Sequence, residues 1–327
     1  MKKRREVLAI LLAAVIFVGV TYSAAWLLIP TRTNYGSTWD SYLQEERDSI
    51  DVLFFGSSMA YCDVVPAIIW EETGLRSYVM AGPEQTIPIT YYYLRETCKT
   101  QSPQAVVVEL TGMFFKEFQN YTKANITYMP WSENRLLATL YAAEHEEQFG
   151  LLFPLYHYHD RVYSVSPAEI QQRLSPQADL MAGYTVLLAK AGQLNQAKRD
   201  FSADTDTYRN NLRYLEKISD FCAKQSIQLI LYIAPAYHQI PDDALAVLKQ
   251  DIAPLPHAAF FDCNDEPWLT EDPPEYWYDE LHYNIYGAVL FSRRFGLRLM
   301  ELDLEITGRN ETLWQERLEA VSNFFPE

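Results

Sequence analysis

The sequence has little glycine and few cysteines, and it lacks the glycine-rich loops that bind nucleotide phosphates. Glycine accounts for 12 of its 327 residues, and neither G-x-x-x-x-G-K-[ST] nor G-x-G-x-x-G occurs. The four cysteines, Cys62, Cys98, Cys222 and Cys263, form no C-x-x-C pair. Their spacing therefore favours neither a zinc site nor a redox motif, and it selects no disulfide pairing. We expect no metal and no cofactor.

The composition also lacks excess positive charge. The formal net charge is -16, which disfavours nucleic acid as a partner. Hydrophobic residues make up 49% of the chain, enough for a sizeable core. A length of 327 residues allows one large domain or two small ones.

One long apolar run is present, at the N-terminus, and no second run of this length follows. Residues 7–29 carry no charge and are long enough to cross a bilayer. Lys2, Lys3, Arg4 and Arg5 precede the run, which predicts a cytoplasmic N-terminus and an extracytoplasmic remainder. A cleaved signal peptide is the alternative, with residues 22–25 as its cleavage region. We expect residues 1–30 to be an uncleaved anchor, followed by a polar stalk over 31–49.

Short apolar runs alternate with helical patterns in two parts of the chain. We expect strands over 51–55, 76–80, 105–110, 227–233 and 258–262. The run at 105–110 is almost continuously apolar, as in a parallel sheet covered on both faces. The alternation predicts a three-layer α/β domain over 50–327 with about five parallel strands.

The regular pattern is interrupted over residues 114–205. Aromatic loops there surround helical stretches expected at 133–149 and 167–173. We interpret this segment as an insertion or cap over the sheet, not as a separate domain. Helices are expected again at 207–224, 241–250, 284–300 and 311–325.

The first strand ends in Gly56-Ser57-Ser58. In open α/β sheets the carboxyl ends of the strands hold ligands and catalytic groups. A serine hydroxyl at this edge is a candidate nucleophile, but it needs a base at neutral pH. The structural alternative is an ordinary turn that caps the next helix.

A candidate base lies near the C-terminus, in the pattern Asp279-x-x-His282. On a turn, Asp279 can accept from one imidazole nitrogen while the other nitrogen faces a substrate. This is the arrangement of orienting acid and base that a serine nucleophile requires. The alternative is a helix N-terminal carboxylate beside an exposed histidine.

The two motifs together resemble those of the SGNH (GDSL-like) hydrolase superfamily, whose fold is flavodoxin-like. The resemblance covers residues 50–115 and 207–300 and leaves the insertion unexplained. It implies that Ser58 is the nucleophile, His282 the general base and Asp279 its orienting carboxylate. The third position of the family's Gly-x-Ser motif falls on Ser58 and not on Ser57.

The oxyanion donors of that family are matched only in part. The family places a glycine after strand two, where Gly82 occurs, although the alignment can instead place Glu84 there. It places an asparagine after strand three, where this chain has Thr111 and no asparagine. One side-chain donor is typically worth about 3–4 kcal/mol of the barrier. Backbone amides at Ser58 and Gly82, with Thr111, are the candidate replacements.

With its N-terminal run, the chain resembles a membrane-anchored extracytoplasmic branch of the superfamily. That branch includes the D-alanyl transfer protein of teichoic acid systems and alginate O-acetylation proteins. Many of its members work beside a multi-span membrane-bound O-acyltransferase. The resemblance implies such a partner and an acyl-carrying or cell-envelope polymer substrate.

Two further residues are candidates for substrate binding. His238 follows the fourth strand at the same sheet edge, where it either contacts substrate or is satisfied by local bonds. Arg161 lies in the insertion and is a candidate for binding a carboxylate or phosphate of the substrate.

Three functions remain open from the sequence. The first is transfer of an acyl group, through an acyl-Ser58 intermediate, onto or from a cell-envelope polymer hydroxyl. The second is an extracytoplasmic carbohydrate esterase, which uses water as the acceptor. The third is a non-catalytic envelope scaffold that binds polymer.

Overall fold

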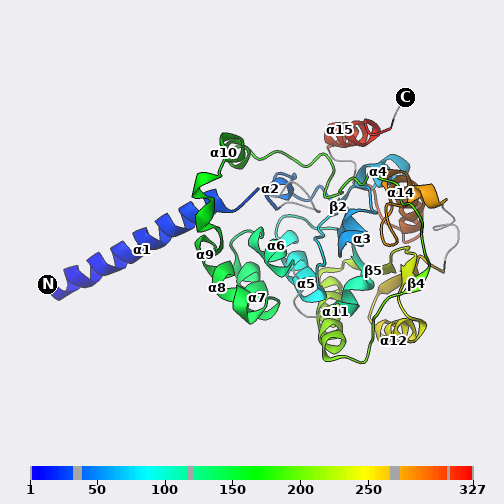
Figure 1. The fold of residues 1–327 in the computed structure, drawn as a ribbon, viewed down its shortest axis with the longest axis horizontal. Helices are drawn as coiled ribbons and strands as arrows, with labels where there is room; N and C mark the ends of the chain where they lie inside the picture. Colours follow the sequence, from blue (N-terminus) through cyan, green and yellow to red (C-terminus); the bar gives the residue numbers. More distant parts are fainter. Residues whose placement is uncertain (1, 32–38, 116–120, 266–272, 308–309, 326–327) are drawn as a thin grey trace.

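The structure is a computed structural model that describes residues 2–31, 39–115, 121–265, 273–307 and 310–325. A long N-terminal helix, α1 (Lys2–Leu28), projects from a body that holds all of the described strands (Figure 1). Among the described residues, α1 alone is long and apolar enough to cross a membrane, by length and composition. Such a helix fits a membrane anchor or a signal sequence.

The main sheet has five parallel strands in the order β2-β1-β3-β5-β7. Leu53 lies opposite Tyr78 on one side and opposite Val106 on the other. The prediction of an α/β fold with five parallel strands is confirmed. The strands are β1 (Val52–Phe55), β2 (Ser77–Val79), β3 (Ala105–Glu109), β5 (Gln228–Ile233) and β7 (Ala258–Asp262).

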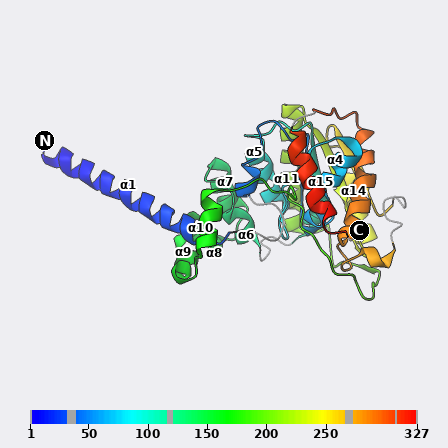
Figure 2. The ribbon, with the colours of Figure 1, turned by 90° about the horizontal axis from the view of Figure 1, so that it is seen from above.

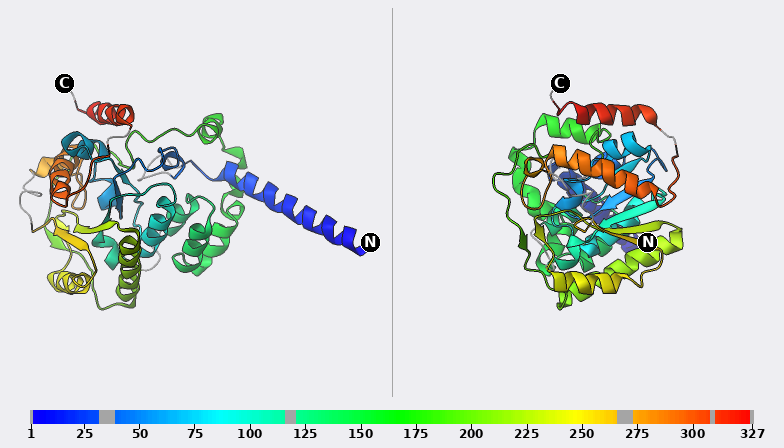
Figure 3. Two further views of the ribbon diagram at one scale, coloured as in Figure 1. Left: turned by 180° about the vertical axis from the view of Figure 1, so that it is seen from behind. Right: turned by 90° about the vertical axis from the view of Figure 1, so that its right-hand side faces the viewer.

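Helices cover both faces of this sheet, because alternate strand residues point to opposite sides and both sets are apolar. Leu53 and Val106 belong to one core, which includes residues of α5 (Ile87–Thr97), α11 (Asp206–Gln225) and α12 (Asp242–Ile252). Phe54 and Val107 belong to the other, with residues of α3 (Ser58–Tyr61), α4 (Pro66–Thr73) and α14 (Ile285–Met300). The right-hand view of Figure 3 shows these helices above and below the strands.

Up to residue 174 the insertion is mainly helical, and these helices lie on the side of the body where α1 ends (Figures 1 and 2). The single helix expected over 133–149 is wrong, since the chain turns after Tyr141 and forms two helices. The chain enters the insertion through η1 (Leu110–Phe114). The helices of the insertion are α6 (Thr122–Thr127), α7 (Glu133–Tyr141), α8 (His145–Leu152), α9 (Leu155–Tyr158), η2 (His159–Tyr163) and α10 (Pro167–Leu174).

A second sheet of two short parallel strands has no counterpart in the sequence predictions. It pairs β4 (Ala197–Lys198), at the end of the insertion, with β6 (His238–Gln239), after β5. Two-residue strands carry too little alternation to be recognised from sequence. The remaining elements are η3 (Pro274–Tyr276) and α15 (Glu311–Ser322).

The expected stalk is wrong in its second half. Helix α2 (Trp39–Tyr42) packs into the core, with Trp39 and Tyr42 each 1% exposed. Their rings contact each other and the buried Tyr93 and Tyr78, so burial of aromatic surface holds this segment on the body. The first half of the predicted stalk, residues 32–38, lies outside the described residues. None of Cys62, Cys98, Cys222 and Cys263, which all lie in the described part of the chain, forms a disulfide.

Candidate active site

Ser58 begins α3 immediately after β1 and the turn at Gly56. Gly56 has φ +149, and a Cβ at this position would lie 2.6 Å from the Cβ of Glu109. The close approach of β1 and β3 therefore requires glycine here. Ser57 is buried and caps α3 by accepting from the amide of Met59 at 3.4 Å. Ser58 is partly exposed, which leaves its hydroxyl as the accessible one.

Asp279 and His282 lie on one tight turn before α14. The Oδ1 of Asp279 accepts from the amides of Leu281 and His282 at 2.8 and 2.9 Å. The same carboxylate lies 2.9 and 3.0 Å from Nδ1 of His282. The backbone bonds fix the carboxylate, and the carboxylate in turn fixes the imidazole ring.

The structure brings Ser58 and His282 into direct contact across 224 residues of sequence. The Nε2 of His282 lies 2.7 Å from Oγ of Ser58. Since a carboxylate only accepts, Nδ1 carries the imidazole proton toward Asp279, and Nε2 accepts from the Ser58 hydroxyl. Burial raises the pKa of Asp279, but hydrogen bonding to His282, the imidazole charge and the two amides outweigh it and lower the pKa overall.

Thr111 is close to this site, but its hydroxyl is already engaged. Its Oγ1 donates to Glu109, and its amide donates to Oε1 of Glu109 at 2.7 Å. The other oxygen of Glu109 accepts from Oγ of Ser57 at 3.2 Å. Burial raises the pKa of Glu109, although these hydrogen bonds and the charge of Arg199 oppose the shift. Glu109 thus links the segment after β1, at Ser57, to the segment after β3, at Thr111.

The loop after β2 holds the other two expected oxyanion candidates. The amide of Gly82 donates to the carbonyl of Gly56 at 3.3 Å, so it is directed at β1 in this structure. Glu84 adopts the left-handed conformation with φ 44. This is a conformation that glycine adopts more readily than other residues, and it is the one the chain takes at the position considered as an alternative to Gly82.

The sequence interpretation missed Arg199, which the structure places beside α3. Its Nη1 lies 3.9 Å from Sδ of Met59, the residue after Ser58. Its guanidinium stacks over the ring of Phe201 at 4.2 Å. Burial lowers the pKa of Arg199, while Glu109 and Glu84 oppose the shift through their charges. No local motif marks this arginine, because its position depends on how the insertion returns to the sheet.

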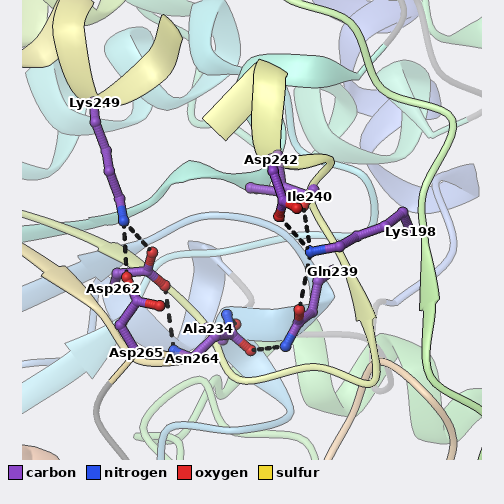
Figure 4. Close-up of polar contacts among 9 residues, drawn as sticks. All are labelled: Lys198, Ala234, Gln239, Ile240, Asp242, Lys249, Asp262, Asn264 and Asp265. Carbon is purple, nitrogen blue, oxygen red and sulfur yellow. Dashed lines mark hydrogen bonds and ion pairs between the residues drawn. The ribbon is translucent and has the colours of Figure 1, made fainter. Parts of the chain in front are cut away.

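A polar network near the carboxyl ends of β5 and β7 holds the end of the insertion, which carries Arg199, against the sheet (Figure 4). Asn264 donates through Nδ2 to the carbonyl of Ala234 at 3.1 Å and accepts from Gln239 at 3.4 Å. Lys198 contacts Oε1 of Gln239 at 3.2 Å, and the amide of Arg199 donates to the carbonyl of Gln239 at 2.8 Å. The network therefore positions Arg199. Its other members are Ile240, Asp242, Lys249, Asp262 and Asp265.

His238 lies next to the site through its backbone. The amides of Tyr237 and His238 donate to the carbonyl of Glu280 at 2.9 and 3.2 Å, within the Asp279–His282 turn. The strand β6 that carries His238 thus supports this turn. Substrate contact by the His238 side chain remains a prediction.

Arg161 does not lie with Ser58. Its Nη1 donates to the carbonyl of Leu28 at 2.7 Å, and its Nη2 pairs with Glu169 at 2.8 Å. Both contacts hold the arginine at the end of α1, where free helix carbonyls attract a cation. These contacts give Arg161 a structural role in the described structure, and binding of a substrate carboxylate or phosphate by Arg161 remains a prediction.

A cavity of about 850 Å³ lies away from the triad, between α2, α10 and residues 175–186. Its lining includes Thr185, whose amide donates to the carbonyl of Tyr61 in α3 at 2.7 Å. None of Ser58, Asp279 and His282 lines this cavity. Among the described residues, no group of three or more His, Cys, Asp or Glu is arranged to hold a metal ion.

Comparisons with known proteins identify a distant structural likeness. No family model matches the chain, and no curated protein matches it. A crystal structure described as a "putative acylhydrolase" from Bacteroides fragilis is similar with a TM-score of 0.38 and 13% sequence identity. The match covers 82% of this chain and 100% of that chain. At this level of similarity, the match carries no information about activity.

Proposed function

We propose that this protein is a serine-dependent acyltransferase of the cell envelope, in which an acyl group passes through Ser58. The observation that carries the proposal is the 2.7 Å contact between Oγ of Ser58 and Nε2 of His282, with Asp279 on the opposite ring nitrogen. A nucleophile, a base within hydrogen-bond reach and a carboxylate that orients the base form the minimal machinery for acyl transfer.

The first half of the reaction forms an acyl-serine. His282 takes the hydroxyl proton at Nε2 while Oγ of Ser58 bonds to the carbonyl carbon of an ester or thioester. The tetrahedral intermediate then collapses, and the departing alcohol or thiol takes the proton from Nε2. Asp279 stabilises the transient imidazolium throughout and keeps Nδ1 protonated.

The second half repeats these steps with an acceptor hydroxyl. His282 removes the proton from the hydroxyl of a polymer sugar or polyol, whose oxygen attacks the acyl-serine. The bond between the acyl carbon and Oγ breaks, and Ser58 regains its proton from Nε2. Water in place of the polymer hydroxyl gives hydrolysis, which is the esterase alternative.

The oxyanion of each intermediate needs donors, and the usual asparagine after β3 is missing. The amide of Ser58, in the first turn of α3, has no partner within its helix and is the first donor. We assign the second contribution to Arg199, whose charge lies beside Met59 and is held there by Gln239. A direct side-chain donor is typically worth about 3–4 kcal/mol, and we expect less from a charge that lies beside the neighbouring residue.

The proposed location follows from α1. As an uncleaved anchor with Lys2–Arg5 on the cytoplasmic side, α1 places the body outside the cytoplasm. There the acyl-carrying substrate and the polymer are both accessible. A multi-span membrane-bound O-acyltransferase is the proposed partner, since an acyl donor made in the cytoplasm must first cross the bilayer.

The test uses the full-length chain in native membranes and a fluorophosphonate probe, with adduct formation read by intact mass. We expect one adduct on the wild type, none on Ser58→Ala or His282→Ala, and normal labelling of Ser322→Ala. Ser322 is an exposed serine on α15 and serves as the matched control. Labelling that persists in Ser58→Ala, or a wild type that stays unlabelled in its own membranes, contradicts the proposal.

A second measurement separates transfer from hydrolysis. The same membranes are given an activated acyl ester with and without an envelope polymer extract. Transfer predicts that ester consumption accelerates with polymer and that acyl groups appear on it by mass spectrometry. Consumption that is indifferent to polymer and yields only free acid supports the esterase.

A further inference from the structure

The insertion contacts the C-terminal end of α1 through specific side chains. The Tyr22 hydroxyl donates to the carbonyl of Leu152 in α8 at 2.7 Å. Arg161 in η2 donates to the carbonyl of Leu28, and the ring of Tyr22 meets the ring of Trp131 at 4.8 Å. The last two turns of α1 are therefore part of the body and not a free linker.

The part of α1 that is exposed on all sides is too short to cross a bilayer. Every residue from 2 to 20 is exposed, whereas Ala25 and Leu28 are buried against the body. The uncharged part that is exposed at every position is Val7–Val20, 14 residues with a length of about 21 Å; beyond it one side of the helix is covered, while Ser23, Trp26 and Leu27 on the other side are exposed. A bilayer hydrocarbon core is about 30 Å thick. The fully exposed helix is therefore about 10 Å shorter than the hydrocarbon core. The remaining length must come from the part of α1 that the body covers.

The elements that cover this part carry exposed aromatic and aliphatic side chains. The most exposed of these side chains are Phe149 (57%), Tyr156 (62%) and Tyr163 (96%). Two more lie between them in sequence, Phe153 (44% exposed) and Val162 (57% exposed). The ring of Phe149 contacts those of Phe153 and Tyr156, so these three form one cluster. Figures 1 and 2 both place α8, α9 and α10 beside the end of α1, on the side of the body nearest the N-terminus.

We propose that the segment from α8 to η2 is immersed in the outer leaflet of the membrane that α1 spans. Immersion of about 10 Å supplies the missing thickness and covers the exposed rings, at a depth typical of helices lying in the interface. Tyrosine and tryptophan at this level are the residues that favour the headgroup boundary. This inference rests on the proposed role of α1 as an uncleaved anchor.

Charge identifies the lipid that suits this surface. The chain has a net charge of -16, and Glu144 precedes α8 while Glu146 and Glu147 lie in its first turn. An acidic surface is repelled by anionic headgroups. The occupant is therefore a zwitterionic lipid surface, and the immersed segment holds the body in one orientation on it.

The experiment measures the depth of spin labels on the full-length chain in phosphatidylcholine vesicles. Labels are placed singly by Phe149→Cys, Tyr156→Cys and Tyr163→Cys. Val247→Cys on α12, 41% exposed in the wild type, is the matched control on another face. The unsubstituted chain measures the background from its own cysteines, and fluorophosphonate labelling of Ser58 checks that each variant folds.

We expect oxygen to relax the three test labels several-fold more effectively, relative to a water-soluble nickel chelate, than it relaxes the Val247 label. Test labels as open to nickel as the control show that the surface stands in water and overturn the proposal. Labels shielded from both reagents show a protein partner or second copy instead of lipid, and also overturn it. If the mature chain is found to begin after α1, the anchor is absent and the immersion proposal fails. Labelling of Ser58 would still be expected in that case, so the proposed acyl transfer is tested separately.

Discussion

The backbone amide of Tyr283 donates to Oδ1 of Asp63 at 2.9 Å, although 220 residues separate them in sequence. Asp63 follows α3, which begins at Ser58, and Tyr283 follows His282. This bond therefore fastens the turn that carries His282 to the segment that carries Ser58. The hydroxyl of Ser292 strengthens the same junction by accepting from the amide of Val65 at 2.7 Å.

Asp63→Asn is expected to be more stable than the wild type, by an amount that grows as the pH rises. Burial raises the pKa of Asp63 well above its ordinary value of 3.8, and the charges of Asp279 and Glu109 add to the shift. The folded state then binds the proton more tightly than the unfolded state, so stability falls as pH rises above about 4. Asparagine keeps a carbonyl acceptor for Tyr283 without this penalty.

The measurement is the melting temperature of Asp63→Asn and the wild type at pH 4 and pH 8. The difference in favour of the variant should grow toward pH 8, with Ser58 labelling retained. Asp63→Ala is the comparison variant, since it leaves the Tyr283 amide without its acceptor and should cost about 1–3 kcal/mol. A variant with asparagine that loses stability at pH 8 would show that Asp63 is needed as a charge.

Asp279→Asn should reduce the rate of fluorophosphonate labelling by about 10²–10⁴-fold, because an amide can favour the wrong tautomer of His282. The pKa of Asp279 is lowered in the folded state, so its contribution to stability is present above pH 3.8 and is lost as the pH falls further. The melting temperature of the wild type should therefore approach that of Asp279→Asn on acidification below about pH 4. Equal labelling rates at pH 7 would contradict the role of Asp279.

Gly56→Ala should destabilise the protein and misplace Ser58. The added Cβ meets the Cβ of Glu109 at 2.6 Å, and φ +149 is unfavourable for any other residue. Strain and overpacking together should cost about 2–4 kcal/mol, measured by urea unfolding. Gly192→Ala is the matched control, because nothing lies within 4 Å of the new Cβ there. Equal unfolding free energies for the two variants would refute this account of the turn.

Arg199→Gln should slow acylation of Ser58 by roughly 10–100-fold, or about 1.4–2.8 kcal/mol, by removing charge beside the oxyanion. The effect is expected in kcat for an activated ester, with KM little changed. Arg199→Lys should recover part of the rate, since it restores the charge without the planar fork. Arg209→Gln, on the exposed surface of α11, is the control. A change confined to melting temperature would make Arg199 a structural residue.

Local patterns were enough to predict the main sheet and its helices. Runs such as Ala105–Glu109 are apolar at successive positions, so both faces of the strand must be buried whatever the rest of the chain does. The same holds for α11, whose apolar stripe needs a core to cover it. Boundaries and short elements were less accessible, as the turn after Tyr141 and the two-residue strands β4 and β6 illustrate.

Part of the candidate site was also visible in the sequence. The chemistry of Gly-Ser-Ser after a strand, and of Asp279-x-x-His282 on a turn, is local in each case, so each motif could be recognised separately. Arg199 could not be recognised, since an arginine on a polar segment looks like any surface arginine. The contacts of Arg161 could not be recognised either, because nothing near it in sequence indicates that the end of α1 lies beside it.

The sequence by itself determined the elements: an N-terminal helix with a charge-free run from residue 7 onward, five buried strands, and two short motifs with the residue types of a serine acyl-transfer site. These depend on periodicity and residue chemistry within a few positions. Tertiary structure alone decided that Ser58 and His282 lie 2.7 Å apart, that Arg199 lies beside Met59 in α3, and that the insertion holds the end of α1. Such relations join segments far apart in the chain, and only the packing of apolar faces against one sheet brings those segments together.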